Sequence, residues 1–311
     1  MVPSSSTRRS SSSTHWRRSD VAEPVTEFDN SGLNVWADPE TFEVTRERIS
    51  EYAAATNDPI PAHLSGDVAP PVFAIVPAFD ALMGPVIDVV PIEIFGRIVH
   101  GEQDFHFHRP IRPGDKLTSR ARVIGYDTVE SGARVSIHLE SCAQDGELVN
   151  EQYLIGFFRG VNAGEAVGEQ VPNHKFDTAL RDGAPLAKVV QHVDADQTFR
   201  YSPASGDPMP IHLEEEVARD AGLPGIIAHG LCTMAFTSWA LLTEVGGSDV
   251  HRLKRFAVRF SKMVLPGDDL ETRIWQTGSG GGETTYAFET ARNGEAGEEF
   301  AITDGLAVFA D

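Results

Sequence analysis

The sequence predicts an α+β protein built from two copies of one unit, and three observations support this prediction. The segment Tyr52–His63 matches Tyr201–His212 at an offset of 149 residues (52 to 201), with Tyr, Asp, both Pro and His coinciding. The segment Phe107–Asp115 matches Phe260–Asp268 at an offset of 153 residues (107 to 260). In each copy a long apolar segment separates the two motifs, and strand-like runs follow the second. Each unit should therefore contain one buried helix and several antiparallel strands.

The first copy begins with an amphipathic segment, Glu40 to Thr56, that leads into the Asp-Pro-x-Pro turn. The apolar segment Val72 to Val90 predicts a buried helix, because its length and its Ala, Leu and Met content favour a helix over a strand. The strand-like runs after the Pro-Gly-Asp turn are Lys116 to Tyr126, Arg134 to Ala143 and Leu148 to Gly160.

The second copy repeats this order, with a shorter amphipathic segment before Tyr201. The apolar segment Ile226 to Leu242 predicts the second buried helix, and the glycines at 278 and 280–282 predict a mobile turn. The strand-like runs are Asp269 to Thr277, Glu283 to Arg292 and Glu298 to Ala310. A curved sheet wrapped around each helix would explain why the helices are apolar on all sides.

These elements divide the chain into four parts. Residues 1–24 are rich in Ser and Arg, and we expect a disordered tail there, although organelle transit peptides have a similar composition. Residues 25–163 form the N-terminal unit and residues 189–311 the C-terminal unit. Residues 164–188, rich in Gly, Pro and charge, form the linker.

The charge balance excludes several classes of partner. The 311 residues contain 26 Lys and Arg against 46 Asp and Glu, a net charge of −20, so neither nucleic acid nor an anionic membrane is expected as a partner. The sequence has no run of about 18 uninterrupted apolar residues, so we expect no membrane span. With only Cys142 and Cys232 it has no disulfide framework, and we expect a reducing, cytoplasmic environment.

The most specific local pattern is Ser-Gly-Asp-Pro-Met-Pro-Ile-His at residues 205–212. Gly206 permits a sharp turn, and the two prolines stiffen the loop that joins Asp207 to His212. A carboxylate and an imidazole held in this way can bind one water and move its protons. Gly230 lies where the second buried helix should begin, so its N–H can donate to a developing oxyanion. This set suits addition of water to a polarised double bond, or its reversal; alternatively, Asp207 caps a turn and His212 is a structural histidine.

Together with Pro-x-x-x-x-His-Gly-Leu-Cys-Thr at residues 224–233, this pattern resembles the MaoC-like (R)-specific enoyl-CoA hydratases, or hydratase 2 group. The resemblance covers about Val21 to Asp311 and implies a double hot-dog fold: two fused units, each a long central helix wrapped by a curved antiparallel sheet. It also implies that the N-terminal unit is degenerate and that the C-terminal unit is catalytic.

The resemblance implies roles for single residues. Asp207 and His212 would form the water-activating dyad, and the N–H of Gly230 would bind the thioester oxygen. The substrate-binding positions would be Ser205, Gly206, His229 and Ser238. One departure is Met209, where the family has Asn, because Met cannot supply the loop hydrogen bonds of an Asn side chain.

The first copy keeps Asp58 and His63 but lacks the rest of the pattern. Alignment of Pro71–Pro77 with Pro224–Gly230 puts Pro77 at the oxyanion position, and proline has no N–H to donate. Asn57 also replaces the turn glycine. We therefore expect the first unit to bind the acyl tail and complete the sheet, without a second active site.

Three further candidates remain open. His106 and His108 alternate at strand spacing and could face one metal ion, but no third ligand is near in sequence, and we expect no metal and no cofactor. The basic segment Arg252–Lys262, with Arg255 at its centre, could bind the phosphates of CoA or be a solvated strand edge. Cys232 lies in the apolar helix and is expected in the core.

The sequence thus predicts a hydro-lyase that hydrates trans-2-enoyl-CoA to (3R)-3-hydroxyacyl-CoA, or runs in reverse, as a monomer or homodimer. The alternatives are a non-catalytic acyl-thioester-binding or partner subunit, a (3R)-hydroxyacyl-carrier-protein dehydratase, and a thioesterase.

Overall fold

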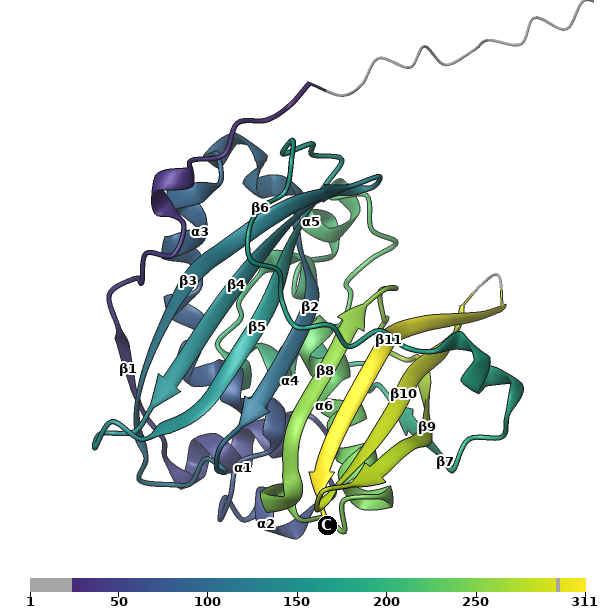
Figure 1. The fold of residues 1–311 in the computed structure, drawn as a ribbon. Helices are drawn as coiled ribbons and strands as arrows, with labels where there is room; N and C mark the ends of the chain where they lie inside the picture. Colours follow the sequence, from purple (N-terminus) through teal and green to yellow (C-terminus); the bar gives the residue numbers. More distant parts are fainter. Residues whose placement is uncertain (1–23, 295–296) are drawn as a thin grey trace, which may run out of the picture.

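One antiparallel sheet runs through both sequence copies (Figure 1). The computed structural model describes residues 24–294 and 297–311, so the expected tail, apart from residue 24, lies outside the described residues. The strands are β1 (Glu40–Glu43), β2 (Ile98–Phe107), β3 (Lys116–Val129), β4 (Gly132–Cys142), β5 (Leu148–Arg159), β6 (Val167–Gly168), β7 (Ala187–His192), β8 (Leu253–Phe260), β9 (Asp269–Gly280), β10 (Glu283–Gly294) and β11 (Gly297–Ala310).

The strand order shows the duplication directly. Strands β2 and β8 pair antiparallel, from Glu102 opposite Arg259 to His106 opposite Arg255, and this pairing joins the two units. Outward from the junction the order is β2-β5-β4-β3-β1 on one side and β8-β11-β10-β9-β7 on the other, while β6 pairs with β3. The two halves therefore have the same topology, related by a local two-fold axis.

The repeated Pro-Gly-Asp turn has the same geometry in both units. Asp115 and Asp268 each accept the backbone N–H of the residue three positions earlier, at 2.9 and 2.8 Å. The glycine before each aspartate has a φ of 93°. A guanidinium binds each carboxylate, from Arg109 in the first unit and Arg292 in the second. The sequence repeat is therefore also a repeat of structure.

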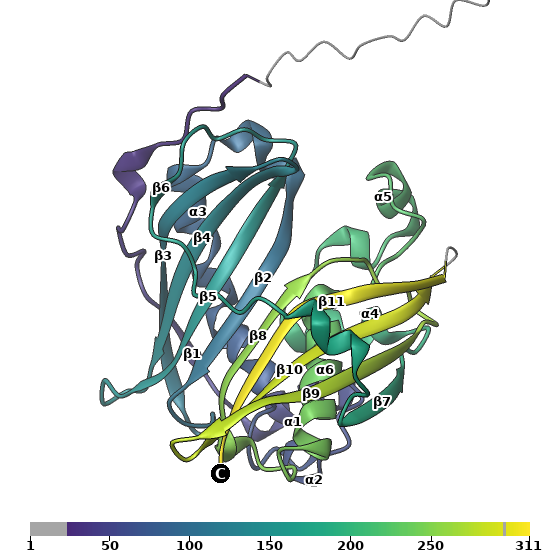
Figure 2. The ribbon, with the colours of Figure 1, turned by 45° about the vertical axis from the view of Figure 1, so that its right-hand side comes forward.

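Most of the α-helices lie behind the sheet in both views (Figures 1 and 2). The α-helices are α1 (Arg46–Ala55), α2 (Pro61–Leu64), α3 (Met83–Val89), α4 (Gln197–Ser205), α5 (Glu215–Asp220) and α6 (Gly230–Glu244). The 3₁₀ segments are η1 (Asn30–Gly32), η2 (Pro71–Ala81), η3 (Ile92–Arg97), η4 (Thr178–Asp182), η5 (Pro210–His212) and η6 (Val250–Arg252).

The central helices of the two units differ. In the C-terminal unit α6 is one regular, largely buried helix, as expected. In the N-terminal unit the single helix predicted for Val72 to Val90 is wrong, because this segment forms η2 and then α3, bent by 53°. Pro77 lies inside η2, and a proline removes an N–H and clashes with the preceding turn, so a regular α-helix cannot continue through it.

Both central segments belong to one hydrophobic core between the sheet and the helices. Val72, Phe73 and Ile75 of η2, and Met234 and Phe236 of α6, are at most 1% exposed and belong to this core. No single helix in the described ranges is long and apolar enough to cross a membrane; η2 and α3 meet that test only as a bent pair.

Residues 164–188 cross the opposite face of the sheet, in front of the strands in Figure 1. Phe176 packs edge-on against Trp275 with ring centroids 5.5 Å apart. The Nδ1–H of His174 donates to the carbonyl of Asp304 at 2.5 Å. The predicted linker is thus bound to the outer face of the junction between the units.

Candidate active site

The segment that bears Asp207 leaves the C-terminal end of α4. Gly206 ends this helix in the left-handed region, with a φ of 83°, which is the sharp turn expected from the sequence. The hydroxyl of Ser205 accepts the N–H of Asp207 at 3.3 Å, and the hydroxyl of Ser202 donates to the carbonyl of Asp207 at 2.7 Å. Both sides of the Asp207 peptide are therefore fixed by serines.

The carboxylate of Asp207 is half-buried and is held by the backbone of the next turn. Its Oδ1 accepts the N–H of Met209 at 3.1 Å, and the carbonyl of Met209 accepts the N–H of His212 at 3.0 Å. The side chain of Met209 is exposed, with 47% of the residue surface accessible. The loop is thus stabilised by backbone hydrogen bonds at Met209.

The imidazole of His212 is buried and oriented by the main chain. Its Nδ1–H donates to the carbonyl of Ile227 at 2.8 Å, which leaves Nε2 as the unprotonated nitrogen of the neutral ring. Burial lowers the pKa of His212 below its ordinary value, although the bond to Ile227 and the charge of Asp207 oppose this. His212 is consequently neutral at neutral pH and able to accept a proton.

A second imidazole stacks on the first. The rings of His229 and His212 have centroids 3.8 Å apart and planes 27° apart, and the ring of Tyr201 lies 4.9 Å from His229 on centroids. Nε2–H of His229 donates to the carbonyl of Asp207 at 3.3 Å. Burial, with the adjacent His212, lowers the pKa of His229 to about 3. The neutral ring of His229 therefore stacks on the ring of His212 and fixes its plane.

Gly230 begins α6, as expected for an oxyanion donor. The first N–H groups of a helix have no acceptor within the helix, and within the described residues the N–H of Gly230 bonds to no other group. A Cβ on Gly230 would lie 3.3 Å from two ring carbons of Phe260. This position thus combines an available donor with little space for a side chain.

The donor set of this cluster does not suit a metal ion. Asp207, His212 and His229 each offer a ligand atom within 4.8 Å of those of the other two. The two imidazoles are stacked, so their in-plane lone pairs run nearly side by side instead of converging on one tetrahedral ion. We assign no metal to the cluster.

The equivalent pair in the first unit has a different arrangement. Oδ2 of Asp58 bonds directly to Nδ1 of His63 at 2.7 Å, and Oδ1 accepts the N–H of Ile60 at 2.8 Å. Both side chains are almost completely buried. Pro77, which the sequence alignment places opposite Gly230, has no N–H. This unit therefore lacks both an available carboxylate and the helix-terminal donor.

The structure does not bring two of the predicted binding residues to this cluster. Arg255 forms a bidentate bond with Asp104, at 3.0 and 2.7 Å, on the outer face of the sheet, so its guanidinium is already paired. Strand β8, which bears Arg255, pairs with β2 and β11, and the strand-edge interpretation of this segment is wrong. Ser238 lies eight residues beyond Gly230 and donates to the carbonyl of Ala235 in its own helix.

The remaining candidates also have partners. His106 lies 3.2 Å from Asp104 and His108 lies 3.1 Å from Glu151, so the two histidines face different carboxylates. Cys232 is buried in α6, as expected.

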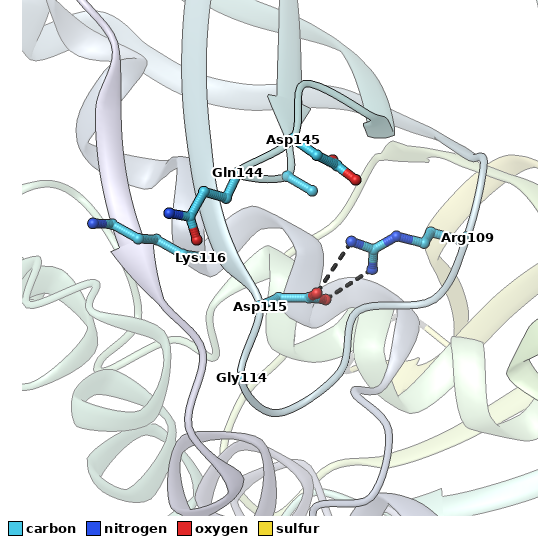
Figure 3. Close-up of a pocket in the computed structure, with 7 residues that line it drawn as sticks. Arg109, Gly114, Asp115, Lys116, Gln144 and Asp145 are labelled. Atoms are coloured by element: carbon cyan, nitrogen blue, oxygen red, sulfur yellow. Dashed lines mark hydrogen bonds and ion pairs between the residues drawn. The ribbon is translucent and has the colours of Figure 1, made fainter.

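A surface hollow of about 420 Å³ lies at the first Pro-Gly-Asp turn (Figure 3). Arg109 points into it, but its guanidinium is bound to Asp115 at 2.8 and 3.1 Å. The hollow is open to solvent and contains none of the predicted catalytic residues, so we assign it no catalytic part.

Several residues that shape the cluster escaped the sequence analysis. Ser202 and Tyr201 lie within the repeated motif. The match of Tyr201 to Tyr52 could have indicated that the two residues contact each other, because their hydroxyls lie 3.3 Å apart. The carbonyl of Ile227 leaves no trace in a side-chain pattern. Arg48, in the other unit, donates to the carbonyls of Pro203 and Ala204 just before the loop, and no local pattern points to it.

The chain is similar to known proteins over most of its length. A model of the MaoC like domain matches residues 178–297, and a model of the FAS1-like dehydratase domain region matches residues 31–152. The 3-hydroxyacyl-thioester dehydratase Y of Mycobacterium tuberculosis is 31% identical over 217 residues, which are 68% of this chain and 72% of that protein. The chain belongs to the MaoC-like dehydratase family.

A further relative and two solved structures are also similar to this chain. A probable enoyl-CoA hydratase 2 of Dictyostelium discoideum is 27% identical over 72% of this chain and 76% of that protein. A MaoC-like dehydratase from Phytophthora capsici superposes with a TM-score of 0.78 at 24% identity, over 90% of this chain and 97% of that one. A Mycobacterium tuberculosis protein described as a double hotdog fold superposes with a TM-score of 0.56 at 12% identity, over 88% and 96%. The predicted family and the predicted double hot-dog fold are confirmed.

Proposed function

We propose that this MaoC-like protein adds water to trans-2-enoyl-CoA to give (3R)-3-hydroxyacyl-CoA, or removes water in the reverse direction. The observation that supports this most is the bond from His212 Nδ1–H to the Ile227 carbonyl, because it leaves Nε2 as a proton acceptor beside an ionisable carboxylate. The names of the relatives, an enoyl-CoA hydratase 2 and a 3-hydroxyacyl-thioester dehydratase, describe the two directions of such a reaction.

In the proposed hydration, one water lies between Asp207 and His212. Nε2 of His212 takes one of its protons, while Asp207 accepts a hydrogen bond from the other and orients the oxygen. The oxygen forms a bond to C3, and the electron pair of the C2=C3 double bond moves toward the thioester oxygen. The N–H of Gly230 donates to that oxygen as negative charge develops there.

The second half of the reaction returns the proton. His212, protonated by the water, donates this proton to C2 on the same face, and the thioester carbonyl re-forms. Because burial lowers the pKa of His212, its protonated form is a stronger acid than an exposed imidazolium. The net reaction adds one water, with the hydroxyl on C3 and the hydrogen on C2, and it uses no redox cofactor.

The net charge of −20 favours CoA over a carrier protein as the group that bears the acyl chain. Acyl carriers that are acidic proteins would be repelled by an acidic partner. CoA also carries phosphates, but it is a small molecule that contacts far less of the acidic surface than a carrier protein does.

A chiral-product assay tests the proposal. The full chain is given short, medium and long trans-2-enoyl-CoA, and Asp207→Asn is assayed beside it. Formation of the (3R) product, abolished in the variant, is the expected result. Bound thioester without turnover would replace the proposal with a thioester-binding subunit, and release of free thiol would replace it with a thioesterase.

A further inference from the structure

The C-terminal end of α4 has two carbonyls that its own chain cannot satisfy. In a longer helix the carbonyls of Pro203 and Ala204 would accept the N–H groups of residues 207 and 208. The N–H of Asp207 bonds instead to the hydroxyl of Ser205, and Pro208 has no N–H. The helix therefore ends, immediately before the catalytic loop, with acceptors that need an outside donor.

The outside donor comes from the N-terminal unit. Nη1 of Arg48, on α1, donates to the carbonyl of Pro203 at 3.2 Å, and Nη2 donates to the carbonyl of Ala204 at 3.2 Å. A guanidinium at a helix C-terminus also complements the partial negative charge there. Only Ser205 and Gly206 lie between this bidentate contact and Asp207.

The contact is one half of a reciprocal arrangement between α1 and α4. Arg200 of α4 donates to the carbonyl of Ala54 at 3.1 Å, and Gln197 donates to the carbonyl of Ala55 at 2.5 Å, at the C-terminal end of α1. Arg48 and Gln197 occupy equivalent positions in the repeat, at the offset of 149 residues. Each helix thus caps the other, and each cap precedes an Asp–His pair.

A second contact from α1 reaches the other side of the cluster. The hydroxyl of Tyr52 bonds to that of Tyr201 at 3.3 Å, inside the core. The ring of Tyr201 packs on His229, which stacks on His212. Helix α1 therefore supports both members of the proposed dyad, one through Arg48 and the other through Tyr52.

We propose that Arg48 is a positioning residue for the dehydratase site of the other unit, holding the end of α4 so that Asp207 faces His212. This inference rests on the proposed function for its kinetic consequence, but the positioning itself is measurable without turnover. It gives the degenerate unit a direct part in the reaction of its neighbour.

The test compares Arg48→Met, which keeps the aliphatic stem, with Arg46→Met on the same helix. Arg46 bonds to the carbonyl of Ser65 at 2.9 Å and to Asp67, all within its own unit, which makes it a matched control. Amide hydrogen exchange over residues 203–209 of the full chain should become faster in Arg48→Met and stay unchanged in Arg46→Met. Unchanged exchange in Arg48→Met would overturn the inference.

Kinetics provide the second readout. In Arg48→Met we expect kcat to fall about tenfold through misplacement of Asp207, with little change in KM. Arg48→Lys should recover part of the loss, because an ammonium can serve one of the two carbonyls. Faster exchange with an unchanged kcat would overturn the catalytic part of the inference. Faster exchange in a chain whose wild type has no hydratase activity would support the positioning and refute the proposed function separately.

Discussion

The two Asp–His pairs have the same residues at the same spacing and opposite arrangements. In the first unit Nδ1 of His63 bonds to the carboxylate of Asp58, and both groups are buried. In the second unit Nδ1 of His212 bonds to the carbonyl of Ile227, and the carboxylate of Asp207 is half-exposed. The difference lies in which group holds Nδ1. Where a backbone carbonyl holds it, the carboxylate and Nε2 both remain available for a water.

Removal of each carboxylate in turn, followed by a turnover assay, tests whether the two pairs differ in function. Asp207→Asn should lower kcat by about 10²-fold or more, because the water that His212 deprotonates loses the carboxylate that orients it. Asp58→Asn should leave turnover per folded molecule within about twofold, because both side chains of that pair are buried away from substrate. The measurement is (3R)-specific hydration of an enoyl-CoA. A loss in Asp58→Asn as deep as in Asp207→Asn would end the distinction between the two units.

The free energy of unfolding should depend more on Asp58 than on Asp207, the reverse of the order expected for turnover. Asp58→Ala leaves Nδ1 of His63 and the N–H of Ile60 without partners in the core, and we expect a loss of about 3–5 kcal/mol in the free energy of unfolding. Asp207→Ala removes one hydrogen bond from a half-exposed loop and should cost about 1 kcal/mol or less. Urea unfolding of the full chain, followed by circular dichroism, measures both. Equal losses would show that the two pairs are held alike.

The oxyanion position gives a third contrast, because Pro77 stands where the second unit has Gly230. Gly230→Pro removes the N–H at the first position of α6, where proline is tolerated, and the extended φ and ψ of His229 (−60° and 136°) suit a residue before proline. We expect kcat to fall about 10²–10³-fold.

Gly230→Ala is the matched control for this change. It adds a comparable Cβ, 3.3 Å from the ring of Phe260, and keeps the N–H. Since the ring must yield by only a few tenths of an ångström, the loss should be much smaller than in Gly230→Pro. Equal losses would mean that crowding, and not the missing donor, explains the effect.

The smallest expected effect is a shift in a pH profile. Turnover requires neutral His212, and burial lowers its pKa below the ordinary value of 6.5. On acidification, the fall in kcat/KM should therefore have its midpoint below 6.5, where the proton occupies Nε2. Steady-state kinetics in buffers of constant ionic strength measure this limb. An acid limb at or above 6.5 would show that His212 is more solvated than the geometry implies.

The repeat made most of the fold predictable. The offsets of 149 and 153 residues identified the duplication, and six strand-like runs correspond to β3, β4, β5, β9, β10 and β11. Strands β2 and β8 were harder to recognise because they lie at the junction, where charged residues such as Asp104 and Arg255 pair across the two units. A charge that is buried by a partner 151 positions away looks like a surface charge in the sequence.

The site was predictable only in its residue types. Gly206, Asp207, His212 and Gly230 follow from local chemistry, because a turn, a carboxylate, an imidazole and a helix start each leave a local pattern. The broken helix was missed because apolar content outweighed Pro77 in the prediction. The roles of the Ile227 carbonyl and of Arg48 could not be predicted. Any residue has a backbone carbonyl, and a contact between the two units has no fixed separation along the sequence.

The junction at β2 and β8 has a consequence for how such a chain can change. In a symmetric homodimer every substitution appears twice, so a damaging one removes both sites together. Here the two halves are encoded separately, and selection can act on each alone. The first half can therefore carry Pro77 within its central segment while the second half keeps Gly230, and it still supplies β2 to the joined sheet and α1 to its neighbour.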